Sequence, residues 1–98
     1  MKAYFIVSVQ ISEQDKRPLY EEYIQLVRPI VESHGGVYLV RTENMEYSPG
    51  AWRPDRLIVI EFPDRASLDR CFASEEYRAV AGLRIQSVEA SAVIVEGE

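Results

Sequence analysis

Four segments of the chain carry the residue pattern of β-strands, at positions 3–11, 37–41, 56–62 and 88–95. The first alternates between apolar and polar residues and is rich in β-branched and aromatic types, which is typical of a strand. The third contains the continuous apolar run 57–60, which is typical of a strand covered on both faces. We therefore predict a sheet of four strands.

Between residues 16 and 34, apolar residues recur at the spacing of one face of a helix. Gly35 and Gly36 follow, and glycine ends helices because it adopts the left-handed conformation without a steric penalty. Pro29 lies inside this helix and removes the backbone donor for the carbonyl of Gln25, so we expect a kink or break there.

A second helical segment is expected after Pro63, with Asp64 as its N-cap. Ser74 offers a second cap, so we expect this helix to break there and restart, ending at Leu83 or Arg84. The inward side of its first part carries Leu68, Cys71 and Phe72.

The resulting order is β-α-β-β-α-β over a single domain, residues 1–98. This order predicts an α+β, ferredoxin-like fold with a four-stranded antiparallel sheet and both helices on one face. The apolar residues of the strands nevertheless fall on both parities, as in Leu57 and Val59 against Ile58 and Ile60. Two helices cover only one face, and the other would be a larger exposed apolar patch than monomers usually carry. We therefore expect a homodimer paired sheet to sheet.

Composition narrows the classes of function. A net charge of −5 argues against nucleic-acid binding, which needs a basic surface to meet phosphates. Cys71 is the only cysteine, which fits a reducing compartment, and no apolar run has the length of a membrane span. The N-terminal apolar run is too short for a secretory signal. We expect a cytoplasmic protein that does not bind a membrane.

Several motifs, taken in order, are similar to those of a known family. They are Gly35-Gly36-Val37-Tyr38-Leu39-Val40-Arg41, the run from Trp52 to Pro63, Ser74-Glu75-Glu76-Tyr77, Leu83-Arg84 and Val95-Glu96-Gly97. Nearly end to end, the chain resembles the domain of unknown function 1330 family of the dimeric α+β barrel superfamily. The resemblance implies the ferredoxin-like fold and the sheet-to-sheet dimer, but no reaction, since the same fold serves many functions. Relatives in the wider superfamily include cofactor-free monooxygenases, chlorite-dismutase-like haem proteins and muconolactone isomerases.

Two residues are candidates for catalysis. Glu61 stands near the end of an apolar strand, where a carboxylate must pair or reach solvent, so it is either an ion-pair partner of Arg41 or Arg56 or a site carboxylate with a raised pKa. His34, the only histidine, is either a helix C-terminal residue favoured by the helix dipole or a general base.

Four residues are candidates for substrate binding. Arg41 and Arg56 flank a long connection, and if their strands pair, they lie at one end of the sheet and can hold an anion. Trp52, the only tryptophan, either anchors that connection or forms the wall of a pocket. Tyr23 is either a packing residue or part of the same pocket.

No phosphate-binding glycine loop, dinucleotide motif or Cys-x-x-Cys is present, so we expect no cofactor and no metal. Two hypotheses remain open. In the first, a cleft between sheet and helices binds or transforms a small organic acid or aromatic compound without a bound cofactor. In the second, the protein is a non-catalytic homodimeric interaction module.

Overall fold

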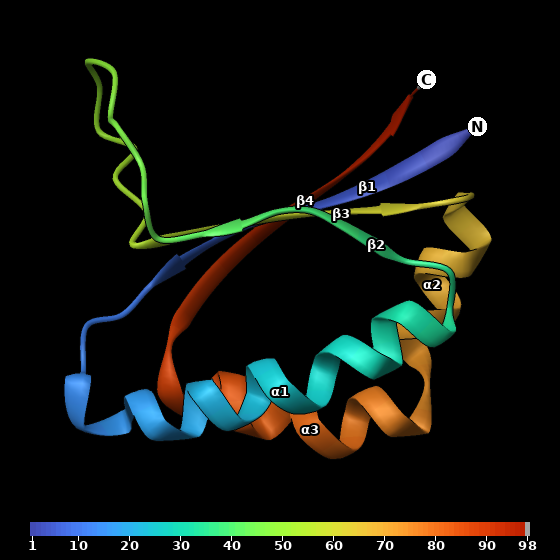
Figure 1. Cartoon of the computed structure of the whole chain (residues 1–98), viewed down its shortest axis with the longest axis horizontal. Coiled ribbons are helices and arrows are strands. Elements are labelled where there is room, and N and C mark those ends of the chain that lie inside the picture. The colour runs from blue at the N-terminus through green and yellow to red at the C-terminus, as the bar shows by residue number, and fades with distance from the viewer. Residues whose placement is uncertain (98) are drawn as a thin grey trace.

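The computed structural model describes residues 1–97, and its four strands form one antiparallel sheet in the order β2-β3-β1-β4. The strands are β1 (Lys2–Gln10), β2 (Val37–Thr42), β3 (Arg56–Phe62) and β4 (Glu89–Gly97). All helices lie on one side of this sheet, as Figure 1 shows. The ferredoxin-like arrangement predicted from the sequence is confirmed, and the bounds of β3 match the prediction.

Helix α1 (Arg17–Ser33) follows a short 3-10 turn at Gln14–Lys16 and runs without a break through Pro29. Of the kink or break expected there, the break is absent. Both Pro29 and Gln25 are exposed, so the carbonyl that loses its donor lies on the solvent side of the helix, where it is open to water. Gly35 ends the helix at φ +84°, as the sequence predicted.

The second helical segment divides into α2 (Arg65–Ala73) and α3 (Glu75–Ser87), and both predicted caps are confirmed. An Asp64 carboxylate oxygen accepts from the Ser67 amide at 2.7 Å, and Ser74 Oγ accepts from the Tyr77 amide at 3.1 Å. Helix α3 ends about one turn later than expected, at Ser87, whose buried hydroxyl donates to the carbonyl of Leu83.

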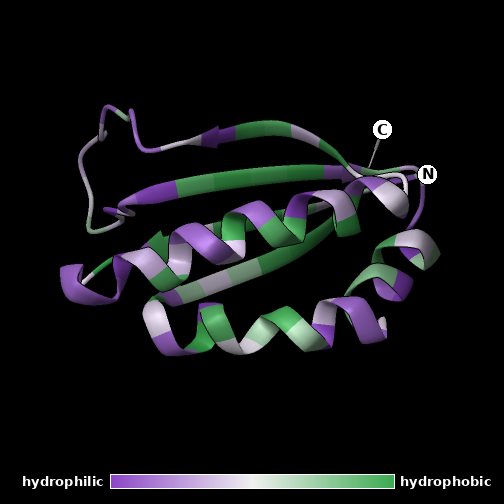
Figure 2. Ribbon diagram, turned by 60° about the horizontal axis from the view of Figure 1, so that its bottom comes forward, coloured by the Kyte–Doolittle hydropathy of each residue, from purple (hydrophilic) through white to green (hydrophobic). Residues whose placement is uncertain are grey.

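The core fills the space between the sheet and the helices. From each strand, alternate residues point into it, and Figure 2 shows the apolar residues along the strands. Its largest fully buried side chains are Tyr20, Phe62, Leu68, Val9, Val31 and Cys71.

The opposite face of the sheet, which we call the open face, has no layer over it. Val93 and Val37 on this face are 57% and 53% exposed. The connection 43–55 between β2 and β3 rises on this side, away from the helices (Figure 1). Within residues 1–97, no helix is both long and apolar enough to span a bilayer.

Candidate functional site

A cavity of about 160 Å³ lies between the sheet and helices α1 and α3. Its wall is mainly apolar and aromatic, with arginines from two sides of the domain. The polar residues that line it are Tyr20, Tyr23, Tyr38, Arg41, Arg56, Tyr77 and Arg84. No carboxylate or imidazole of residues 1–97 borders this cavity.

Arg41 and Arg56 lie at the same end of the sheet, as expected from the sequence. Arg41 pairs with Ile58 across the β2–β3 ladder, two residues from Arg56, and all three face the helices. An irregularity in the ladder between Tyr38 and Val40 brings Arg41 to this face. In a regular strand, residues three apart such as Tyr38 and Arg41 point to opposite faces, so the bulge is what allows both to line the cavity.

The guanidinium of Arg56 is buried and only partly satisfied. The residue is 9% exposed, and its Nη1 lies 3.4 Å from Glu43 Oε2. Its Nε has no hydrogen-bond partner within residues 1–97. A buried donor without an acceptor costs about 1–3 kcal/mol, so the guanidinium of Arg56 is under-satisfied by its protein neighbours.

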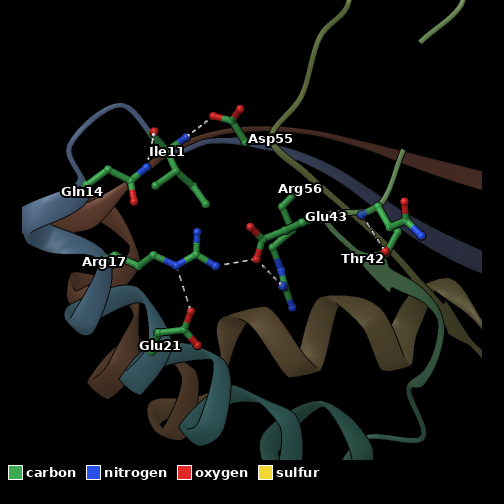
Figure 3. A network of polar contacts seen from close by, with 9 residues as sticks. Ile11, Gln14, Arg17, Glu21, Thr42, Glu43, Asp55 and Arg56 are labelled. Atoms are coloured by element: carbon green, nitrogen blue, oxygen red, sulfur yellow. Dashed lines mark hydrogen bonds and ion pairs between the residues drawn. The ribbon is translucent and has the colours of Figure 1, made fainter. Parts of the chain in front are cut away.

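Glu43 is shared between two arginines. Its Oε2 accepts from Arg17 Nη2 and also contacts Arg56, as Figure 3 shows. The hydrogen bond from Arg17, with a smaller contribution from Arg56, holds the pKa of the Glu43 carboxyl below its usual value. Glu43 is therefore ionised at neutral pH, but it offers one charge to two cations.

Contacts with β1 fix the position of Arg56. The preceding residue, Asp55, donates its amide to the carbonyl of Val9 at 2.9 Å and accepts the amide of Ile11 on its carboxylate at 2.7 Å. Gln10 adds a bond from its side-chain amide to the carbonyl of Arg53 at 2.8 Å. The long connection is thus tied to the sheet immediately before the arginine enters the cavity.

Aromatic rings support both guanidinium groups. Arg41 lies 5.0 Å from the ring centroid of Tyr38, and Arg56 lies 5.9 Å from that of Tyr20. These distances suit cation–π attraction, which orients a guanidinium without neutralising it. Arg41 makes no ion pair with any acid of residues 1–97.

Burial holds three tyrosines of the cavity, Tyr20, Tyr23 and Tyr38, in the neutral form. Burial raises the pKa of Tyr38 to about 12, and burial also raises the pKa of Tyr20 and Tyr23 above the usual value. The hydroxyls of Tyr23 and Tyr77 are 3.1 Å apart. At neutral pH the hydroxyls of Tyr20, Tyr23 and Tyr38 can therefore donate hydrogen bonds to an anion and do not act as bases.

Three of the predicted site residues border the cavity, namely Tyr23, Arg41 and Arg56. Glu61 does not, because it has the parity of Leu57 and Val59 and therefore lies on the open face, where it pairs with Lys2 at 3.1 Å. The partner expected for Glu61, Arg41 or Arg56, is thus corrected to Lys2.

His34 and Trp52 also lie outside the cavity. His34 caps the end of α1, with Nδ1 2.8 Å from the carbonyl oxygen of Ile30. Trp52 is 64% exposed and borders a shallow depression on the open face with Ile6 and Val93. The catalytic roles suggested for Glu61 and His34 remain predictions, and neither residue reaches the cavity.

Sequence reasoning missed Tyr77 and Arg84 as cavity residues. Both come from α3, whose weak amphipathic pattern gives little indication of which side faces the sheet. Tyr77 has one available signal, since it is the residue that the Ser74 cap fixes at the start of α3. Arg84 has none, because an arginine near a helix C-terminus is common on surfaces.

A cluster of metal ligands is not found in the described part of the chain, where no three histidine, cysteine, aspartate or glutamate side chains gather. The one free thiol, Cys71, is buried in the core, and burial raises its pKa to about 11. A thiol in this state is a packing group, not a nucleophile.

Comparison with solved structures supports the fold. The chain superimposes on a dimeric ferredoxin-like protein of unknown function from a Jannaschia species with a TM-score of 0.82 and 14% identity, covering 99% of this chain and 100% of that one. A protein of unknown function from Rhodopseudomonas palustris gives 0.76 and 18%, covering 99% and 82%. SnoaB, a cofactor-independent oxygenase from Streptomyces nogalater, gives 0.70 and 10%, covering 99% and 93%. At these identities the likeness shows the fold alone.

No curated protein matches the sequence. The family model for the domain of unknown function DUF1330 matches residues 2–98, nearly the whole chain. The family that the sequence motifs suggested is therefore confirmed, and the chain belongs to the DUF1330 family.

Proposed function

We propose that this protein binds a small organic anion with an aromatic or equally compact apolar body in the cavity between the sheet and the helices. One observation carries the proposal: Arg56 is nine-tenths buried, lines the cavity and has an Nε–H without an acceptor within residues 1–97. A ligand carboxylate would bind this under-satisfied guanidinium through charge-assisted hydrogen bonds.

Charge supports an anion as the ligand. The chain is acidic overall, at −5, yet Arg41 and Arg56 stand together beside a wall without carboxylates. Two guanidinium groups at one end of an apolar cavity fit a carboxylate, whose two oxygens each accept from a planar donor.

Size supports a single ring. A volume of about 160 Å³ is close to that of an engineered apolar cavity of about 150 Å³ known to accept benzene. Phe5, Phe72 and the tyrosine rings of the wall would pack against an aromatic body. The favoured class is therefore a monocyclic aromatic acid or a compact aliphatic acid.

Binding is the core of the proposal. A chemical step on the bound anion, such as an oxygenation without a bound cofactor, would depend on the tyrosine hydroxyls, since Glu61 and His34 lie elsewhere. Because the fold is similar to that of the oxygenase SnoaB, oxygen-dependent turnover of a bound anion is a reaction to assay, but the similarity does not identify a substrate.

The test is a calorimetric titration with sodium benzoate of the wild type and of Arg56→Gln, Arg41→Gln and Arg78→Gln. Arg78 is an exposed residue of α3 that does not line the cavity and serves as the matched control. We expect benzoate binding that weakens about tenfold or more in the first two variants and stays unchanged in Arg78→Gln. Absence of binding to the wild type, or equal binding by all four proteins, would overturn the proposal.

We also propose that the open face pairs with a second copy of the chain. Val37, Leu39, Val93 and Val95 are exposed apolar residues of the same sheet, and the Jannaschia neighbour is a dimer. Burial of this face would remove apolar area from water at about 25 cal/mol per Å². Light scattering of the purified protein tests this: a mass of two chains supports it, and a single chain at high concentration contradicts it.

A further inference from the structure

Arg84 is a third arginine in the wall of the cavity, and it comes from a different side. Arg41 and Arg56 are on β2 and β3, whereas Arg84 is on α3. Ala90 and Ala92 of β4, the opposite edge of the sheet, also line the cavity. The cationic groups of the cavity wall thus come from two sides, the sheet and α3.

The surroundings of Arg84 contain donors but no acid. The residue is half-buried and interacts with the hydroxyls of Tyr77 and Tyr23. Within residues 1–97, no carboxylate forms an ion pair with it. A charge removed from water without a counter-ion is costly, so a second negative group of the ligand would be stabilised here.

The Tyr23 and Tyr77 hydroxyls make this second side specific for oxygen acceptors. They lie 3.1 Å apart, so each can bond to the other, and one of the two protons stays available for a further acceptor. Burial raises the pKa of Tyr23, which keeps its hydroxyl neutral and able to donate. Arg84 and the tyrosine pair therefore form a cluster that presents donors and one positive charge.

Resting on the proposed function, the geometry points to a dianionic ligand: a compact dicarboxylic acid, with one carboxylate at Arg41 and Arg56 and the other at Arg84, Tyr77 and Tyr23. The charge count agrees, because within residues 1–97 three arginines border the cavity and Glu43, the only acid that forms an ion pair with any of them, is itself shared with Arg17. A monoanion would leave one side of the cavity wall without a counter-ion.

The experiment compares benzoate with the three benzenedicarboxylate isomers on the wild type, Arg84→Gln and Arg78→Gln. We expect at least one isomer to bind the wild type about tenfold more tightly than benzoate. In Arg84→Gln that advantage should disappear, so that the preferred isomer and benzoate bind with similar affinity, and Arg78→Gln should behave as the wild type. The monoamide of the preferred isomer has the same shape without the second charge, so it should bind as benzoate does.

The outcomes separate the two proposals. If benzoate does not bind, the anion site itself is refuted. If benzoate binds but no isomer exceeds it, or if the advantage persists in Arg84→Gln, the dianion inference is refuted and the anion site stands. Binding of the monoamide as tight as that of the dicarboxylate would also refute the inference, because shape and not charge would explain the preference.

Discussion

The two faces of this sheet have similar apolar strands and different surroundings. On the helix side, Phe5 and Ile60 pair across β1 and β3, and the ring of Phe5 packs against Phe72 of α2, with 4.4 Å between the ring centroids. On the open side, Ile6 lies between Val59 and Val93, and Val93 is 57% exposed. The amino-acid pattern of a strand therefore specifies an apolar face, but it does not specify which element or partner covers that face.

Charges are arranged differently on the two faces as well. The helix face has Arg56 buried within it, and the Nε–H of this arginine has no acceptor within residues 1–97. The open face has Glu61 near one end, paired with Lys2 and partly exposed to water. Buried charge without full compensation points to a ligand, whereas an apolar surface with its charge at the margin points to a protein partner.

The largest expected effect comes from a charge on the open face. Val93→Asp should dissociate the proposed dimer, since burying a carboxylate in an apolar interface would cost about 3 kcal/mol, or about 100-fold in affinity. The single chain tolerates the change because Val93 is mostly exposed. Trp52 borders the same depression, so its fluorescence should shift to longer wavelength in the variant, alongside the drop in mass by light scattering.

Ala79→Asp is the matched control, because Ala79 is exposed on α3, on the other side of the molecule. It should remain a dimer. A dimeric Val93→Asp protein would show that self-association uses another surface.

An intermediate effect is expected from the tyrosines of the helix face. The unfolded chain releases the Tyr38 proton near pH 10 and the folded chain near pH 12. Between these values the unfolded state binds fewer protons, so the free energy of unfolding should fall as pH rises, by on the order of 2 kcal/mol for this group. Tyr20 and Tyr23 act in the same direction.

Denaturant titrations across that pH range measure the slope of the free energy of unfolding against pH. Tyr38→Phe should flatten it by roughly one proton. An unchanged slope in Tyr38→Phe would argue that this hydroxyl is not shielded from water.

The smallest effect is expected at Glu43. Its lowered pKa means that it stabilises the fold above its usual pKa and loses this contribution as pH falls through the lowered value. Since its side chain is 37% exposed, Glu43→Gln should cost only about 0.5 kcal/mol at neutral pH, a difference from the wild type that vanishes in acid.

The same variant should bind benzoate somewhat more tightly, because Glu43 competes with the ligand for Arg56. Denaturant titration of Glu43→Gln should thus show a lower free energy of unfolding, whereas calorimetry should show a higher affinity for benzoate. Weaker benzoate binding by Glu43→Gln would mean that Glu43 orients Arg56 for the ligand instead of competing with it.

Local signals explain how much of the fold was predictable. The strand alternation, the Asp64 and Ser74 caps and the end of α1 at Gly35 all depend on neighbours within a few residues. The sequence could not show how Pro29 would be accommodated, because that depends on which side of α1 faces water.

The candidate site was only partly predictable, for tertiary reasons. The sequence placed Arg41 and Arg56 at one end of the sheet. Arg41 reaches the cavity, however, because of a bulge in β2 that no residue type in this strand predicts. The parity of Glu61 was visible in the sequence, and its consequence is that the carboxylate lies on the face away from the helices. Arg84 enters the cavity from α3 through helix packing, which periodicity alone does not resolve.

A crystal structure of the protein with benzoate tests the central claim most directly, because it places an anion on one face or the other. The account predicts density between the sheet and the helices, with a carboxylate oxygen within hydrogen-bond distance of the Arg56 guanidinium. Benzoate bound on the open face beside Trp52, with the cavity at Arg56 holding no anion, would contradict it.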